Sequence, residues 1–205
     1  MGAAFLFDTT ASLAAAAVHG AIHAYVAYAP AGQEARFDGL IAPGTRLILA
    51  DGHSVHAPGV EAFGRVLLHA ATALFAQGYG AVALISADSP TVPTAWYARA
   101  AARILAPGPR ALLGLAEDGG YWLIALQSPT PALFARIAWS TDAAGADTTA
   151  RAAEAGIPLE PAGTWFDVDD RDSLARLLDP AADAYAAPAT MALVDTLGLR
   201  ERLAA

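Results

Sequence analysis

A short apolar run that ends in an acid constrains the fold of this 205-residue chain more than any other segment. Residues 81–86 are rich in Val, Leu and Ile, are bounded by Gly80 and Pro90, and lead into Asp88. Such a run predicts a strand that is buried on both faces, as in the centre of a parallel sheet. Asp88 would then lie just past the carboxyl end of that strand, where open α/β sheets bind ligands. Asp88 is therefore a candidate metal or nucleotide contact, and a turn or helix-capping role is the alternative.

Helical and strand-like segments alternate along the rest of the chain. The clearest helix is residues 61–77, where apolar side chains recur with the i, i+3, i+4, i+7 spacing. We expect further helices at 3–18, 94–105, 141–155, after 170 and at 190–203, and strands at 21–28, 47–49, 111–115, 121–126 and 157–159. This alternation favours right-handed crossovers and a largely parallel sheet. The length suits one domain that spans residues 1–205.

The composition excludes several classes of protein. The net charge is −8 and every basic residue is Arg, which argues against non-specific nucleic-acid binding and leaves no Lys to contact a phosphate. Because the chain has no Cys, disulfides, thiolate chemistry and zinc–thiolate sites are excluded. The apolar N-terminal stretch is too short to span a bilayer and lacks the basic start of a signal peptide. We expect a cytoplasmic protein that contacts neither nucleic acid nor membrane.

Asp167 and Asp169 form the most concentrated acidic pair. In a strand, residues two apart face the same side, so both carboxylates would point one way with Val168 packed behind them. Two carboxylates that close repel each other by roughly 1–4 kcal/mol, and a divalent cation removes this repulsion. Oxygen ligands suit Mg²⁺ or Mn²⁺. The alternative is that residues 167–172 are the acidic first turn of a helix, with Asp170 as its N-cap under either interpretation.

Asp118-Gly119-Gly120 lies between two predicted strands and is typical of a hairpin turn. The two glycines would also let a ligand approach the backbone, and their N–H groups could bind an anion. Both interpretations stay open at this point. Farther along the chain, Ser140 is the predicted N-cap of the helix that begins at Thr141.

Four motifs together resemble one bacterial family, and they occur in its order and at its spacing: residues 85–93, 116–124, 133–141 and 167–169. This is the glycosyltransferase-like family often labelled selenodomain-associated transferase. The resemblance extends from about Phe5 to the C-terminus, and its Phe-Leu-x-Asp-Thr stretch matches residues 5–9. The family is similar to nucleotide-diphospho-sugar transferases of the glycosyltransferase A-type and to phospholactate guanylyltransferases. The resemblance implies a three-layer α/β fold with a mostly parallel, Rossmann-like sheet between helices.

The resemblance also implies a metal site. Asp88 matches the family's acid on the metal and nucleotide side, and Asp167 and Asp169 match acids that hold divalent cations at the phosphates. The implied protein is a transferase dependent on Mg²⁺ or Mn²⁺, either a glycosyltransferase or a nucleotidyltransferase, with a nucleotide or nucleotide-sugar as substrate. The ion would neutralise the diphosphate leaving group.

The remaining motifs match the side that receives the transferred group. Asp118, Gly119 and Gly120 match the loop that faces the small-molecule acceptor or the sugar. Asp118 is the candidate catalytic residue that orients or deprotonates the acceptor hydroxyl. Ser140 and Thr141 match a substrate-binding loop at a helix N-terminus, a natural place for a phosphate or carboxylate.

The chain departs from the family pattern at its start. Family members begin with a strand and a Pro- and Gly-rich loop that ends in Lys-Thr-Arg-Leu, whereas Met1-Gly2 leads directly into a predicted helix here. A gene start placed too late, a natural short form completed by a partner subunit, and a degenerate member that binds no nucleotide stay open as explanations. The second function hypothesis is therefore a non-catalytic or truncated member that acts as a binding or assembly protein. A sheet without this strand would expose apolar edge surface, so we expect a homo-oligomer.

Overall fold

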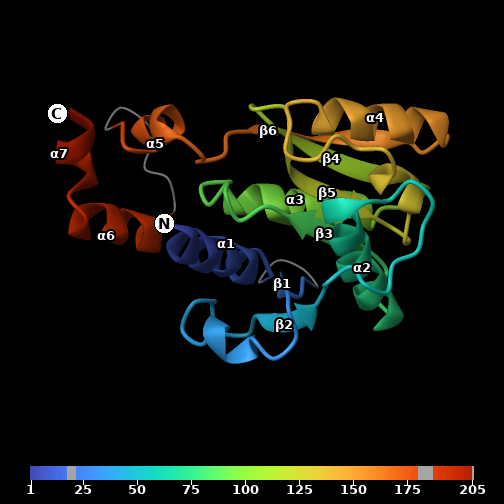
Figure 1. Cartoon of the computed structure of the whole chain (residues 1–205), viewed down its shortest axis with the longest axis horizontal. Coiled ribbons are helices and arrows are strands. Elements are labelled where there is room, and N and C mark those ends of the chain that lie inside the picture. The colour runs from blue at the N-terminus through green and yellow to red at the C-terminus, as the bar shows by residue number, and fades with distance from the viewer. Residues whose placement is uncertain (18–21, 180–186, 205) are drawn as a thin grey trace.

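The computed structural model describes residues 1–17, 22–179 and 187–204 and shows an α/β arrangement (Figure 1). Its strands are β1 (Tyr25–Tyr28), β2 (Arg46–Leu49), β3 (Val82–Ile85), β4 (Ala111–Ala116), β5 (Tyr121–Leu126) and β6 (Leu159–Trp165). Its helices are α1 (Gly2–Ala17), α2 (Ala62–Ala76), α3 (Thr94–Ile104), α4 (Ala144–Glu154), α5 (Arg171–Leu177), α6 (Pro188–Thr196) and α7 (Leu199–Ala204). Two short 3-10 helices are η1 (Glu34–Phe37) and η2 (Pro131–Phe134).

The strands form two sheets. β1 and β2 pair in parallel, and a four-stranded sheet has the order β3-β5-β4-β6. β5 runs antiparallel to both β3 and β4, whereas β6 is parallel to β4, so three of these four strands share one direction. The predicted α/β fold with a sheet between helices is confirmed, and the four-stranded sheet is mixed because β5 runs against the other three strands.

Helices cover both faces of the four-stranded sheet. On one face α2 and α4 pack over a core that contains Leu68, Leu113 and Phe134. On the other face α1 and α3 pack over a core that contains Tyr97 and Trp122. The alternation of side chains along β4 and β5 thus supplies two cores from one sheet, which is the three-layer arrangement.

The prediction that β3 is a central strand buried on both faces is wrong for this structure. Among the described strands β3 has only β5 as a neighbour, and of its four residues only Val82 is buried. The reason is that β5, which arrives through the hairpin after β4, occupies the position between β3 and β4. Asp88 still follows the carboxyl end of β3, as expected.

The C-terminal helices form a third packed unit at one end of the molecule (Figure 1). The helix predicted at residues 190–203 is divided into α6 and α7, because Gly198 between them has a φ of 57°, a left-handed conformation that suits glycine. Leu177, Leu178 and Val194 are the buried residues of this unit. The predicted beginning of the first strand and end of the first helix lie partly outside the described residues.

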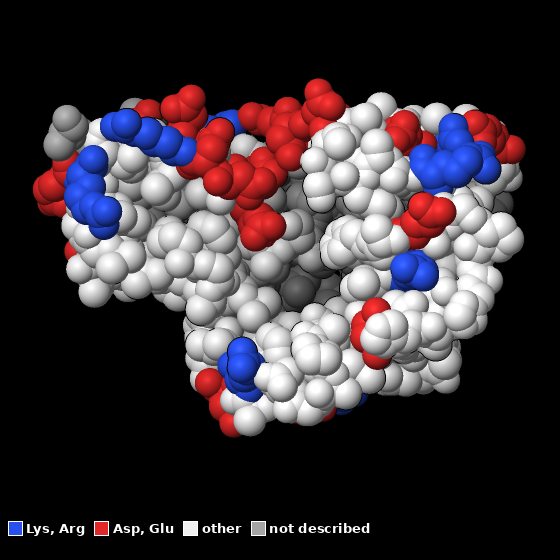
Figure 2. Space-filling model, viewed as in Figure 1, with Lys and Arg blue, Asp and Glu red and all other residues white. Residues whose placement is uncertain are grey.

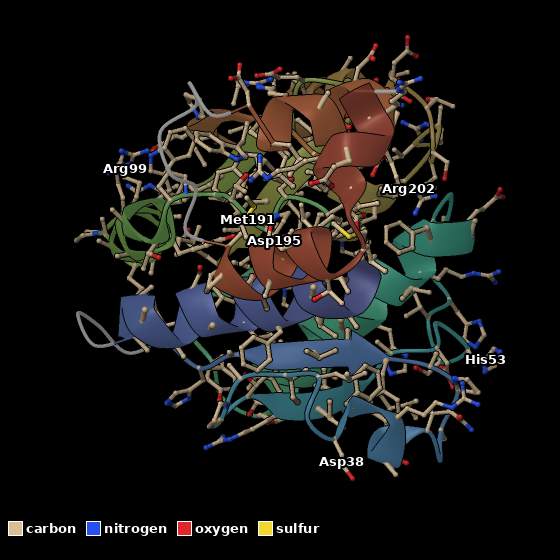
Figure 3. All side chains as sticks on the ribbon, turned by 90° about the vertical axis from the view of Figure 1, so that its left-hand side faces the viewer. Asp38, His53, Arg99, Met191, Asp195 and Arg202 are labelled. Carbon is tan, nitrogen blue, oxygen red and sulfur yellow. The ribbon has the colours of Figure 1, made fainter. Side chains whose placement is uncertain are left out.

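A buried carboxylate joins α1 to α6, which lie side by side in Figure 3. The Asp8 side chain is 1% exposed, and its two oxygens accept hydrogen bonds from the backbone N–H groups of Ala189 (3.0 Å) and Thr190 (2.7 Å). These N–H groups belong to the first turn of α6, where no helical carbonyl can accept them. Asp8 therefore caps α6 from the other end of the sequence.

Within the described ranges, none of the helices is both long enough and apolar enough to cross a membrane.

Replacing Asp8 with Ala should destabilise the protein by about 2–4 kcal/mol, because two buried N–H groups would lose a charged acceptor. The free energy of unfolding in urea measures this effect. Asp38→Ala is the matched control, since Asp38 is exposed and its side chain accepts none of the hydrogen bonds observed here. Equal stability of the two variants would contradict the capping role.

Candidate functional site

The candidate site is built at the carboxyl edge of the four-stranded sheet, where β3, β4 and β6 all end. Asp118 lies in the turn from β4 to β5, and Asp167 and Asp169 follow β6. The loop after β3 is joined to the segment after β6, because the Val168 N–H donates to the carbonyl oxygen of Asp88 at 2.8 Å. Four acids from three segments that are distant in sequence therefore reach one edge.

Three of these acids form a compact group. One carboxylate oxygen each from Asp118, Asp167 and Asp169 lies within 4.8 Å of the other two. Asp118 and Asp169 are exposed and Asp167 is half-buried. Asp88, which the sequence predicted as a metal ligand, lies outside this group of three, and Asp118 takes the place beside the predicted pair. An all-oxygen set at this spacing fits Mg²⁺ or Mn²⁺ in its donor chemistry.

The electrostatics of the group follow from its crowding. Burial raises the pKa of Asp167 to about 6, and the charges of Asp118 and Asp169 add to the shift. Burial also raises the pKa of Asp169, with contributions from the charges of Asp88 and Asp118. A carboxylate near other carboxylates is harder to ionise, and a bound cation would reverse that effect.

The segment that carries Asp167 and Asp169 is held by a helix cap. The Asp170 side chain accepts from the Ser173 N–H at 2.8 Å, while the Asp170 N–H donates to the Ser173 hydroxyl at 3.1 Å. The Asp169 N–H donates to the same hydroxyl, also at 3.1 Å. The predicted N-cap of α5 is confirmed, and it fixes the backbone at Asp169 as well.

The turn with Asp118 is held against the loop before α4. Gly119 has a φ of 94°, and a Cβ added to it would collide with the carbonyl oxygen of Asp142. The Gly119 carbonyl in turn accepts from the Gly145 N–H at 2.8 Å. The loop that holds Ser140 and Thr141 therefore continues directly into the contact with the acidic turn.

The N–H groups of the two glycines are already used. Gly119 N–H donates to the carbonyl of Ala116 at 3.2 Å, and Gly120 N–H donates to the Asp118 carboxylate at 2.8 Å. The turn is thus the hairpin that its sequence predicts, and neither of these two N–H groups is a free donor for an anion.

Ser140 does not cap α4, so this prediction is wrong. The helix begins at Ala144 with Ala143 as its N-cap, and Ser140 has a left-handed backbone with a φ of 61°. Thr141 instead organises the loop, since its hydroxyl donates to the Ala138 carbonyl (2.7 Å) and accepts from the Ala143 N–H (3.2 Å). A three-residue shift of the helix start, from Thr141 to Ala144, cannot be predicted from residue preference alone.

Sequence reasoning missed an aromatic and cationic support below the acids. The Arg176 guanidinium lies 4.1 Å from the ring centre of Phe166 and forms an ion pair with Glu117. The indole N–H of Trp165 donates to the Thr91 hydroxyl at 3.0 Å. The sequence signal for this support is the aromatic pair Trp165-Phe166 directly before Asp167. Large rings next to an exposed acidic segment can bury their surface and so anchor the segment.

The space-filling view shows where charged side chains gather on one face of the molecule (Figure 2). Acidic side chains gather in a band across the upper part of this face, and the surface below the band is hollowed and mostly uncharged. The hollow offers a place for a ligand beside the acidic band.

The raised pKa of Asp167 predicts how the metal-free protein responds to pH. Because the folded-state pKa of about 6 exceeds the ordinary value of 3.8, the folded protein keeps a proton that the unfolded chain has lost between these values. Stability from this group therefore falls as pH rises from about 4 to 6. In EDTA, Asp167→Asn should raise Tm above pH 7 by about 2–4 °C, which corresponds to about 1 kcal/mol after solvent screening.

Thermal unfolding measured from about pH 4 to above pH 7 provides the check. The exposed variant Asp172→Asn is the control. A Tm gain for Asp167→Asn that stays constant with pH would contradict the electrostatic explanation.

Gly119→Ala should destabilise the protein by about 2 kcal/mol more than Gly78→Ala, because only the first forces overlap with neighbouring backbone. Gly78 is a matched control: its φ is 93° against 94° for Gly119, and an added Cβ there meets nothing within 4 Å. Urea unfolding of both variants separates steric overlap from the shared cost of a left-handed alanine. Equal losses would show that the contact with Asp142 is unimportant.

Comparison with known proteins identifies a similar fold and one matching family. A crystal structure of a protein from Desulfovibrio desulfuricans G20, provisionally described as a nucleotide-diphospho-sugar transferase, is similar with a TM-score of 0.74 and 24% identity, and the match covers 96% of this chain and 82% of the other. This likeness shows a shared fold. Rv0371c from Mycobacterium tuberculosis H37Rv matches at 15% identity over 83% of each chain, and its TM-score of 0.45 is too low to support an argument.

No curated protein matches the sequence. The model of one protein family does match, over residues 12–141, and that family is described as an uncharacterized protein conserved in bacteria (DUF2064). These residues include the loop after β3, the Asp118 turn and the loop before α4. The chain is a member of the DUF2064 family.

Proposed function

We propose that this protein is a metal-dependent transferase that acts on a nucleotide-activated substrate, either a nucleotide-sugar or a nucleoside triphosphate. One observation carries the proposal: Asp118, Asp167 and Asp169 converge within 4.8 Å at the carboxyl edge of the sheet. That edge is where open α/β sheets bind nucleotides. The fold shared with the Desulfovibrio protein supports the same class of substrate.

Asp167 and Asp169 would hold Mg²⁺ or Mn²⁺, and Asp118 lies close enough to be the third oxygen ligand. The ion would neutralise the charge that develops on a departing diphosphate. Asp88 would act from the nucleotide side, since its charge is felt at Asp169 and its backbone is bonded to Val168. Asp118, exposed at the rim of the group, also remains the candidate that orients the acceptor hydroxyl.

Gly119, Gly120, Ser140 and Thr141 are proposed to contact the substrate. The packing of Gly119 on Asp142 supports this, because it places the acidic turn and the loop before α4 next to each other. A substrate beside Asp118 would meet both segments.

A non-catalytic binding or assembly role is the second candidate. The chain has no Lys to contact phosphates. The nearby Arg176 is held by Glu117 and the Phe166 ring. The proposed self-association also remains, and it is supported by the sheet edges: among the described strands, β1 pairs only with β2 and β3 only with β5.

Calorimetric titration with Mn²⁺, and then with GDP, UDP, GTP and UDP-glucose in the presence of Mn²⁺, tests the proposal. We expect Mn²⁺ to bind, and its affinity to fall at least tenfold in Asp169→Asn because one of three anionic ligands is lost. Asp172→Asn is the matched control, since Asp172 is an exposed acid three residues away that lies outside the group.

Nucleotide binding that requires Mn²⁺ would support the transferase. Mn²⁺ binding that is equal in both variants would place the ion elsewhere and overturn the site. Mn²⁺ binding without binding of any nucleotide would favour the non-catalytic role.

A further inference from the structure

A pocket lies on the face of the sheet covered by α2 and α4, and Asp142, three positions after its Trp139, packs on Gly119 of the acidic turn. Its volume is about 130 Å³, and it is lined by Gly59, Glu61, Arg136, Ile137 and Trp139. Its two walls are joined, because the Arg136 N–H donates to the Gly59 carbonyl at 2.8 Å.

Aromatic rings pack around Trp139, which lines this pocket. The Trp139 ring makes an edge-to-face contact with Tyr121, at 6.3 Å between ring centres, and Tyr121 directly follows Gly120. On its other side Trp139 meets Phe63 edge-to-face at 5.6 Å. Phe63 is in the first turn of α2 and is 53% exposed, although large aromatic side chains usually bury most of their surface. Trp139 therefore gives the pocket an aromatic wall, and the exposed ring of Phe63, which lies outside the lining itself, packs against Trp139.

The backbone around the pocket is strained. In the part of the chain that the structure describes, three non-glycine residues have a left-handed backbone: Ala62 (φ 45°), Arg136 (φ 55°) and Ser140 (φ 61°). Arg136 lines the pocket, and the other two adjoin Glu61 and Trp139. Such conformations are uncommon for residues with a side chain and concentrate at binding sites and active sites.

The polar groups of the pocket have opposite characters. Glu61 precedes α2, but its exposed side chain caps nothing and has no partner among the described residues. Its carboxylate is thus a free acceptor. Arg136 uses one nitrogen in an ion pair with Glu154 (2.8 Å), and its guanidinium has further N–H donors. A ligand in this pocket would meet an acceptor, donors and an aromatic wall.

We propose that this pocket binds a carbohydrate ring, which serves as the acceptor of the proposed transferase, and this proposal rests on that function. A pyranose has a C–H face that packs on an aromatic ring and hydroxyl groups that both donate and accept hydrogen bonds. An anionic ligand is disfavoured by Glu61, and a cationic one by Arg136. The cavity is smaller than the ~300–1,000 Å³ typical of sites for drug-sized ligands, so it suits a single ring.

In the transfer, a hydroxyl oxygen of the ring would form the new bond to the activated carbon or phosphorus of the nucleotide substrate. The bond from that atom to the diphosphate breaks, and the diphosphate leaves with the electron pair. The hydroxyl proton passes to a carboxylate, for which Asp118 is the candidate. The chain that runs from Trp139 of the pocket to Asp142, which packs on Gly119, joins the pocket to the turn that carries Asp118.

Saturation-transfer NMR with four methyl α-glycosides (of glucose, mannose, galactose and N-acetylglucosamine) tests the pocket in EDTA and without nucleotide. We expect at least one glycoside to bind, and its Kd to rise at least tenfold in Phe63→Ala and in Glu61→Gln. Leu105→Ala is the matched control, because Leu105 is a large apolar residue that is 58% exposed and lies outside the pocket. If Phe63→Ala fails to fold, the isosteric Glu61→Gln decides.

Absence of binding by all four glycosides would overturn the proposal, as would a Kd unchanged in both pocket variants. The test is separable from that of the proposed function, because Asp169→Asn should lose Mn²⁺ and keep the glycoside. If the protein binds the glycoside but neither Mn²⁺ nor nucleotide, the carbohydrate pocket is supported and the proposed transferase function is contradicted. If the protein binds Mn²⁺ and nucleotide but no glycoside, the metal site is supported and the carbohydrate pocket is contradicted.

Discussion

The packing of Trp122 determines where the acidic residues lie. Its side chain is 1% exposed, and its indole N–H donates to the Gly163 carbonyl at 3.2 Å. Gly114 on β4 makes room for it, since an added Cβ would overlap the ring. The pairing of β4 with both β5 and β6 shifts register next to Gly114. The Trp122 ring of β5 therefore contacts both β4, at Gly114, and β6, at Gly163. Asp118 follows β4 and Asp167 follows β6, and both therefore depend on this buried contact for their separation.

At the acidic edge, the ionised forms of Asp167 and Asp169 are disfavoured, whereas the ionised form of the neighbouring Asp170 is favoured. Burial and like charges raise the pKa values of Asp167 and Asp169, whereas the Ser173 N–H and hydroxyl lower the pKa of Asp170. The helix cap thus stabilises the backbone that holds two unfavourable charges in place. Such an arrangement is typical of functional sites, where local stability is lower than elsewhere in the fold. The proposed cation would neutralise this crowding of negative charge.

Local chemistry made much of this structure predictable. The helix over α2 follows from its apolar spacing, the hairpin from Asp118-Gly119-Gly120, and the start of α5 from Asp170, because each depends on residues close in sequence. Ser140 was mispredicted as a cap because tertiary contacts with the acidic turn delay the start of α4. The grouping of Asp118 with Asp167 and Asp169 also needed the structure, since no local pattern measures distances across three strands.

By itself, the sequence determined the order of helices and strands, the acids at strand ends and the family motifs that predict a transferase. These depend on periodicity, on turn and capping preferences, and on residue types, all of which act over a few neighbours. Only the tertiary structure decided that β5 separates β3 from β4, that Asp8 caps α6, and that Phe63 packs against Trp139 of the pocket. The reason is physical: these contacts join residues far apart in the chain, and their geometry arises from packing rather than from local preference.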